Sequence, residues 1–186
     1  MGVLMNRPGM NDNCVIGLCG LPGAGKSHLA RQLAEHAGWL LLDRDRIRAE
    51  LFGARSDSAA TRAAEQAMAT CMVESLYAGR AVILDGMTLA RGVDRRHWAR
   101  AAQAAGGQWV LLYLDCPLAL ARERVAADRD RGGHPAPDRD PALVERVAAR
   151  LETPGPEESP LVLDGGDPPG VEELLGRLRA LGEMGT

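Results

Sequence analysis

A glycine-rich segment near the amino end of the chain has the residue types and spacing needed to hold a phosphate. Residues 20–27 have the sequence Gly-Leu-Pro-Gly-Ala-Gly-Lys-Ser, which fits the pattern G-x-x-x-x-G-K-[ST]. In such a segment the backbone N–H groups turn inward around a phosphate, and the following helix adds a partial positive charge at its N-terminus. Lys26 would reach the β- and γ-phosphates, and Ser27 would offer its hydroxyl to Mg²⁺.

The segment therefore predicts a nucleotide site with ATP and Mg²⁺ as cofactors. The residues expected to bind the nucleotide are Gly20, Leu21, Pro22, Gly23, Ala24, Gly25, Lys26, Ser27 and His28. Lys26 is the only lysine among 22 basic residues, and the others are all arginines. A planar guanidinium would not fit a ring of backbone donors, so the lone lysine supports this interpretation. We expect Lys26 to lie at a solvent-facing helix start.

Two apolar runs end in an aspartate that could lie near this site. Asp85 follows the run Ala-Val-Ile-Leu, and a carboxylate at the end of a buried strand can hold the water shell of Mg²⁺. The alternative is that Asp85 merely caps the turn after the strand. Asp115 also ends an apolar run, and we assign it a structural role.

A second candidate site follows the next apolar run. Asp45 and Arg48 are three residues apart, so on a helix they share one face. Beside a γ-phosphate, the carboxylate could accept a hydroxyl proton and the guanidinium could hold an anion. The alternative is a solvated helix start, where an acidic residue is common. Asp43 could compete for the role of base, but it is expected to terminate the strand.

Arginines run into a segment that is too rich in Pro and Gly to pack, residues 129–140. The arginines of this stretch are Arg122, Arg124, Arg129 and Arg131. An arginine on a closing loop can stabilise a transferred phosphoryl group and exclude water, so the segment is interpreted as a mobile lid. The alternative is a charged helix face with alternating signs. Two further basic clusters, at residues 44–48 and 91–100, favour an anionic acceptor.

Short apolar runs alternate with longer Ala-rich stretches, which is typical of βαβ units that form a parallel sheet. The expected strands are 14–19, 39–43, 81–85, 109–115 and 161–163. The expected helices are 26–37, 45–51, 59–78, 93–105, 117–130, 141–151 and 171–181. These elements predict a single domain over residues 14–186, preceded by a disordered tail over residues 1–13.

Composition limits the class of protein. The chain has 186 residues, 46% of them hydrophobic, and a formal net charge of -3, which disfavours a protein that coats nucleic acid. No apolar run approaches the ~18 residues needed to span a bilayer. Four scattered cysteines without a C-x-x-C pair favour a reducing cytoplasmic location. We expect a monomer or a homodimer.

From Cys14 to Leu181 the motifs resemble the small P-loop kinases of the polynucleotide-kinase and zeta-toxin-like group. The resemblance implies an α/β fold: a P-loop NTPase three-layer αβα sandwich whose five-stranded parallel sheet has the order 2-3-1-4-5, with an Arg-rich lid. It also implies that Asp45 is the general base and that Arg48 binds the acceptor or its phosphate. Arg124 and Arg129 would be lid contacts to the nucleotide.

One departure from this group affects the expected acceptor. Relatives have Asp-Ala-Thr-Asn-Leu where this chain has Asp-Gly-Met-Thr-Leu, so Thr88 replaces an asparagine. The expected function is transfer of the ATP γ-phosphate to a hydroxyl of an anionic small molecule or a polynucleotide 5′ end, and a long nucleic acid is not favoured. The alternative is a nucleotide-dependent switch or ATPase without a small-molecule acceptor.

Overall fold

The computed structural model describes residues 13–131 and 140–183. The expected tail over residues 1–12 and the centre of the expected lid, residues 132–139, lie outside the described residues. Asn13 was assigned to the tail, and this is wrong. Its carbonyl accepts a hydrogen bond from Gln108 N at 2.9 Å and its side-chain amide donates to Gly106 O at 2.8 Å, so the ordered domain already includes it.

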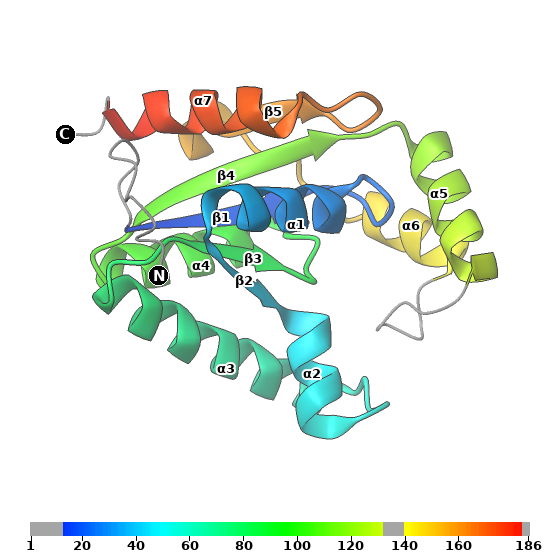
Figure 1. Ribbon diagram of the computed structural model, residues 1–186. Helices are drawn as coiled ribbons and strands as arrows, with labels where there is room; N and C mark the ends of the chain where they lie inside the picture. The colour runs from blue at the N-terminus through cyan, green and yellow to red at the C-terminus, as the bar shows by residue number, and fades with distance from the viewer. Residues whose placement is uncertain (1–12, 132–139, 184–186) are drawn as a thin grey trace, which may run out of the picture.

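Five parallel strands form one sheet, in the order β2-β3-β1-β4-β5 that was predicted (Figure 1). The strands are β1 (Cys14–Cys19), β2 (Leu40–Asp43), β3 (Val82–Asp85), β4 (Gln108–Asp115) and β5 (Leu161–Asp164). Each predicted strand agrees with an observed one to within one residue at either end. The carboxyl ends of all the strands therefore lie at one edge of the sheet.

Seven α-helices and one short 3-10 turn connect the strands in the described residues. They are α1 (Lys26–Ala37), α2 (Arg44–Phe52), α3 (Ser58–Tyr77), α4 (Gly92–Ala104), α5 (Leu118–Arg131), α6 (Pro141–Ala148), η1 (Pro156–Glu158) and α7 (Val171–Glu183). The first three residues of the expected lid, 129–131, belong to α5, which continues to Arg131. The last turn of α5 is supported by an ion pair between Arg131 and Asp128 at 3.5 Å.

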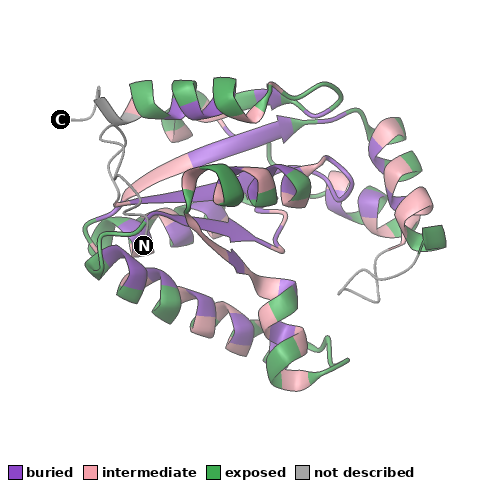
Figure 2. Ribbon diagram, in the orientation of Figure 1, coloured by how far each residue is buried: buried purple, intermediate pink, exposed green. Residues whose placement is uncertain are grey.

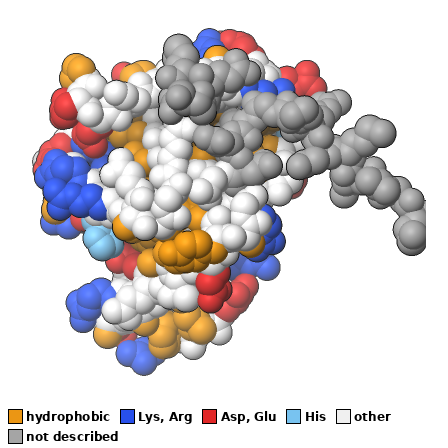
Figure 3. All heavy atoms as spheres, turned by 90° about the vertical axis from the view of Figure 1, so that its left-hand side faces the viewer, with side chains coloured by type: hydrophobic (Ala, Val, Ile, Leu, Met, Phe, Trp, Pro, Cys, Tyr) orange, Lys and Arg blue, Asp and Glu red, His pale blue; other side chains and the backbone are white. Residues whose placement is uncertain are grey.

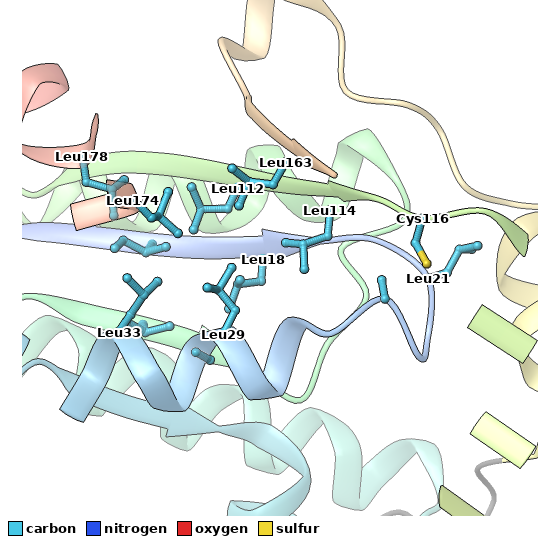
Figure 4. Packing of buried hydrophobic residues seen from close by; sticks show 14 of the residues in the cluster. Leu18, Leu21, Leu29, Leu33, Leu112, Leu114, Cys116, Leu163, Leu174 and Leu178 are labelled. Carbon is cyan, nitrogen blue, oxygen red and sulfur yellow. The ribbon is translucent and has the colours of Figure 1, made fainter. Parts of the chain in front are cut away.

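The first face of the sheet is covered by α1 and α7. Alternate residues of β1, Ile16 and Leu18, point to this side and belong to one cluster with Leu29, Leu33 and Leu174 (Figure 4). Neighbouring residues of a strand point to opposite faces, so the remaining residues of β1 must pack on the other side. β1 and β3 are buried along their whole length, β2, β4 and β5 are buried only in part, and the outer faces of the helices are exposed (Figure 2).

The second face of the sheet is covered by α3 and α4. Val15 of β1 packs there with Met68 and Met72 of α3 and with Trp98 of α4. Apolar layers on both faces complete the predicted three-layer αβα sandwich. In the described residues, no helix is both long enough and apolar enough to cross a membrane.

The carboxyl edge of the sheet carries most of the predicted site residues, because β1, β2 and β3 are neighbours there. Asp43 at the end of β2 is the register partner of Asp85 at the end of β3. Helices α5 and α6 extend beyond this edge (Figure 1). Figure 3 shows the opposite end of the molecule, where acidic and basic side chains lie among apolar ones.

Candidate active site

The segment between β1 and α1 is a tight loop that requires its glycines. Gly20, Gly23 and Gly25 have φ angles of 146°, 83° and 97°, a region that other residues rarely adopt. A Cβ atom at Gly20 would also lie 2.7 Å from the carbonyl oxygen of Leu114. The loop can therefore turn its backbone toward a ligand only with these small residues.

Lys26 begins α1, but it is not solvent-facing, so this part of the prediction is wrong. Its side chain is buried, and Nζ donates hydrogen bonds to Gly20 O at 2.9 Å and to Leu21 O at 2.7 Å. The loop folds back over the helix start and covers the aliphatic stem of the lysine. The ammonium group consequently lies inside the loop, where a bound phosphate would be.

Ser27 and Asp85 lie together, as a magnesium site requires. Ser27 Oγ donates a hydrogen bond to Asp85 Oδ1 at 3.1 Å, and Asp85 is buried at the end of β3. A hydroxyl and a carboxylate are the oxygen ligands that suit Mg²⁺, which usually keeps several waters and binds substrate phosphates as well. Within residues 13–131 and 140–183, no group of three or more His, Cys, Asp or Glu side chains is placed to hold a metal ion by itself. A magnesium ion at Ser27 and Asp85 would therefore need water and phosphate oxygens as its other ligands.

Asp43 serves as the N-cap of α2. Its carboxylate accepts hydrogen bonds from the backbone N–H groups of Asp45 at 2.9 Å and Arg46 at 3.3 Å. Burial, together with the nearby charge of Asp85, raises the pKa of Asp43. These contacts support the expectation that Asp43 ends the strand, because its lone pairs already stabilise the start of the next helix.

Asp45 and Arg48 lie on one face of α2, which confirms the geometry predicted from their spacing. Arg48 Nη1 lies 3.6 Å from Asp45 Oδ1, and Arg44 Nη2 lies 3.0 Å from the same oxygen. Asp45 and Arg48 are 9% and 6% exposed. A carboxylate held between two guanidinium groups and turned toward the phosphate loop can accept a proton from a hydroxyl nearby.

Two cavities meet at this point. The larger, about 770 Å³, is lined by residues of the phosphate loop, α1 and α5 and by the loop after β5. The smaller, about 280 Å³, is lined by Pro22, Lys26, Ser27, Arg44, Asp45, Arg48, Ser56, Thr61, Asp85, Gly86, Met87, Thr88, Leu143, Val147 and Arg150. Lys26, Ser27, Asp45 and Gly86 line both cavities. Two different ligands could thus reach the same side chains from separate directions.

Several residues of the smaller cavity were not selected from the sequence. Ser56 precedes the N-cap of α3, Thr61 lies in the first turn of that helix, and Arg150 follows the end of α6. None belongs to a motif, and each reaches the cavity only through the fold. The capping aspartate between them, Asp57, predicts a helix start but says nothing about what the neighbouring hydroxyls face.

The two arginines expected to be lid contacts differ in position. Arg124 of α5 lines the larger cavity and donates to Gly165 O at 2.6 Å, to Gly166 O at 3.3 Å and to Gly23 O at 3.4 Å. It links the phosphate loop to the loop after β5. Arg129, five residues further along α5, lines neither of the two cavities.

The basic cluster at residues 91–100 does not face either cavity, so its assignment to an anionic acceptor is wrong. Arg91 forms an exposed ion pair with Asp94 at 2.9 Å. Arg95 is buried and donates to both carboxylate oxygens of Glu158 at 2.6 and 2.7 Å. Glu158, which neutralises the charge of Arg95, lies 63 positions further along the sequence.

Arg95 also stabilises the loop between β3 and α4, which contacts the phosphate loop. Its Nη1 donates to Leu89 O at 3.0 Å and to Glu152 O at 2.9 Å. In the same loop, Thr88 O accepts a hydrogen bond from Gly20 N at 3.1 Å. Arg95 therefore fixes the backbone on which both the phosphate loop and one wall of the smaller cavity rest.

We predict that Arg95→Met destabilises the protein by about 3–5 kcal/mol, because removing one partner of a buried ion pair leaves the other charge uncompensated. Urea unfolding at neutral pH measures the loss. Arg91→Met is the control, and its exposed pair contributes much less. Equal losses in the two variants would contradict the structural role of Arg95.

The same ion pair predicts a pH dependence. The hydrogen bond from Arg95 lowers the pKa of Glu158 in the folded state. The stability that this carboxylate contributes is thus present above the pKa of the unfolded chain and is lost as the pH falls through the folded-state pKa. The unfolding free energy of Arg95→Met is expected to decline less with acid than that of the unsubstituted protein.

A parallel sheet of this order, with a glycine-rich loop between β1 and α1 and a carboxylate at the end of the adjacent β3, defines a P-loop nucleotide-binding domain. The chain belongs to the AAA domain family, which matches residues 15–154. A search of curated proteins finds no match.

Solved structures share the fold. A gluconokinase from Sinorhizobium meliloti is 21% identical with a TM-score of 0.65, over 93% of this chain and 95% of that one. A sugar kinase from Janibacter is 22% identical with a TM-score of 0.61, over 89% and 91%. Kti12 from Chaetomium thermophilum, in complex with ADP-AlF3, is 22% identical with a TM-score of 0.65, over 86% and 94%. At these identities the similarity establishes the common fold.

Proposed function

We propose that this protein is an ATP-dependent phosphotransferase that acts on a hydroxyl group. The observation that carries the proposal is the meeting of two cavities at Lys26, Ser27 and Asp45. The larger cavity would bind ATP through the phosphate loop, and the smaller would bind the acceptor. The names of two structural neighbours, a gluconokinase and a sugar kinase, agree with this reaction, and the ADP-AlF3 complex of a third agrees with the nucleotide.

The reaction follows from these positions. Asp45 accepts the proton of the acceptor hydroxyl while the oxygen of that hydroxyl forms a bond to the γ-phosphorus of ATP. At the same time the bond between the γ-phosphorus and the β–γ bridging oxygen breaks, and ADP is released. Lys26 stabilises the charge on the transferred group. Ser27 and Asp85 would hold Mg²⁺, which would supply positive charge to the phosphate oxygens. From α5, Arg124, which lines the larger cavity, is the proposed additional contact to the nucleotide.

The acceptor in this proposal is anionic, either a small molecule or a polynucleotide 5′ end. Arg48 supports this, because its buried guanidinium lines the smaller cavity and its contact with Asp45, at 3.6 Å, is longer than a hydrogen bond. A buried guanidinium needs oxygen partners, and an anion in the cavity would supply them.

The second candidate is a nucleotide-dependent switch or ATPase without a small-molecule acceptor. The test is ADP release, measured with a panel of hydroxyl compounds and with none. A kinase forms ADP much faster with an acceptor than with water alone and yields a phosphorylated product in equal amount. ADP release that no compound accelerates would favour the switch or ATPase.

The proposed magnesium site gives a direct prediction. Asp85→Asn is expected to raise the Mg²⁺ concentration needed for half-maximal turnover about 10–100-fold, because a neutral amide holds the ion and its waters less well than a carboxylate. Asp115→Asn is the matched control, since Asp115 ends β4 on the other side of β1. An unchanged Mg²⁺ requirement in Asp85→Asn would remove this residue from the metal site.

A further inference from the structure

One wall of the smaller cavity comes from α6 and the turn that follows it. Leu143, Val147 and Arg150 line the cavity and follow one another at helical spacing. The first two are apolar and Arg150 ends the row with a positive charge. This wall is separate in the chain from α2, which supplies Arg44 and Arg48.

The backbone next to Arg150 is firmly held. Two residues further on, Glu152 donates its N–H to Ala90 O at 2.8 Å and receives hydrogen bonds from Arg95 at its carbonyl, at 2.9 Å, and from Gly92 N at its carboxylate, at 2.8 Å. Arg150 N itself bonds to Val147 O at 3.1 Å. The arginine therefore extends from a fixed turn and not from a loose chain end.

The guanidinium of Arg150 has no protein partner in the described part of the chain, where it forms no ion pair and no hydrogen bond. By contrast, Arg122 of α5 and Arg146 of α6 pair with Glu145 at 3.2 Å and with Asp140 at 3.7 Å. Four cations but two carboxylates line the smaller cavity. Asp45 already contacts two arginines of α2, and Asp85 contacts Ser27, so neither carboxylate of the cavity pairs with Arg150. Arg150 is exposed, and its guanidinium is therefore accessible to an anion that enters the cavity.

We infer that Arg150 is a specificity-determining residue that binds the anionic group of a small hydroxylated acid, with a carboxylate or a phosphate monoester as that group. The inference rests on the proposed phosphotransferase function and names its acceptor class. With about 280 Å³, the cavity lies just below the ~300–1,000 Å³ typical of sites for drug-sized ligands, so it suits a compound of a few carbons. Such an acceptor would lie across the cavity, with its hydroxyl near Asp45 and its anionic group at Arg150.

The experiment is calorimetric titration of the full chain with Mg²⁺ and a non-hydrolysable ATP analogue present. The probes are matched pairs that differ in charge: gluconate and sorbitol, glycerate and glycerol, and glycerol 3-phosphate and glycerol. A 5′-hydroxyl oligonucleotide is the macromolecular probe. The variant is Arg150→Gln, and Arg146→Gln, an arginine of α6 outside both cavities, is its control.

We expect at least one anionic probe to bind more tightly than its neutral partner. Arg150→Gln should weaken that anion about 10–100-fold, which corresponds to the loss of a hydrogen-bonded charge, and should leave the neutral probe and the ATP analogue unchanged. Arg146→Gln should behave as the unsubstituted protein. The carboxylate and phosphate pairs show which anion is preferred.

Each other result overturns the inference. Equal binding of anionic and neutral probes, or an anion preference that survives in Arg150→Gln, removes the assigned role. Tight binding of the oligonucleotide alone replaces the small acid with a polynucleotide. If the ATP analogue binds but no probe does, the acceptor class is wrong while the nucleotide site stands. If the analogue itself does not bind, the proposed function fails as well.

Discussion

Replacing Lys26 with Ala is expected to lower phosphoryl transfer by at least about 10³-fold. The ammonium group lies inside the phosphate loop, so its loss removes the positive charge closest to the transferred group, and a preorganised charge of this kind contributes several kcal/mol to the transition state. The measurement is the turnover rate at saturating ATP, with an acceptor that the unsubstituted protein phosphorylates.

Two further variants separate charge from packing at this position. Because Lys26 is buried, Lys26→Met keeps the aliphatic stem that the loop covers and removes only the charge. It should be as inactive as Lys26→Ala while unfolding at nearly the same temperature as the unsubstituted protein. Lys26→Arg keeps the charge in a planar group that does not fit the loop, and it should stay inactive. Full turnover in Lys26→Met would show that residues 20–27 are not the catalytic loop.

The second large effect is expected at Asp45. Asp45→Asn should lower turnover about 10²–10⁴-fold, the usual contribution of a general base, because an amide cannot accept the hydroxyl proton. The affinity for ATP should change little, since the phosphate loop and Lys26 are untouched. Turnover and nucleotide affinity are measured separately, and the ratio of the two losses decides the role.

Glu50 provides the matched control for this measurement. It is an exposed carboxylate of the same helix, pairs with Arg46 at 2.9 Å and lines neither cavity. Glu50→Gln should therefore leave turnover within a few-fold. If ATP affinity in Asp45→Asn falls as far as turnover does, Asp45 belongs to the nucleotide site and not to the acceptor side.

Much of the framework could be predicted from the sequence because its signals are local. The glycine spacing of residues 20–27 predicts the loop, and the apolar run before Asp85 predicts its place at a strand end. The three-residue spacing of Asp45 and Arg48 determines that they share a helix face. Each of these inferences uses residues within one or two turns of each other.

The errors concern side chains whose surroundings come from distant segments. Arg95 was grouped with other arginines because composition does not reveal that Glu158 neutralises it. Lys26 was placed in solvent because a helix start is usually exposed, whereas the preceding loop covers it here. No sequence motif marks Arg150 as a site residue, because only the packing of α6 against the rest of the fold brings it to the smaller cavity.

The way the two cavities are built also bears on how such a protein could diverge in evolution. The smaller cavity is formed by residues from α2, from around the start of α3, from the end of β3 and its following loop, and from α6 and the turn after it, besides the phosphate loop and the start of α1. It shares just four of its residues with the larger cavity. Substitutions at Ser56, Thr61 or Arg150 would alter the proposed acceptor side without changing the glycine loop. A gene duplicate could thus acquire a new acceptor while it inherits the nucleotide chemistry unchanged.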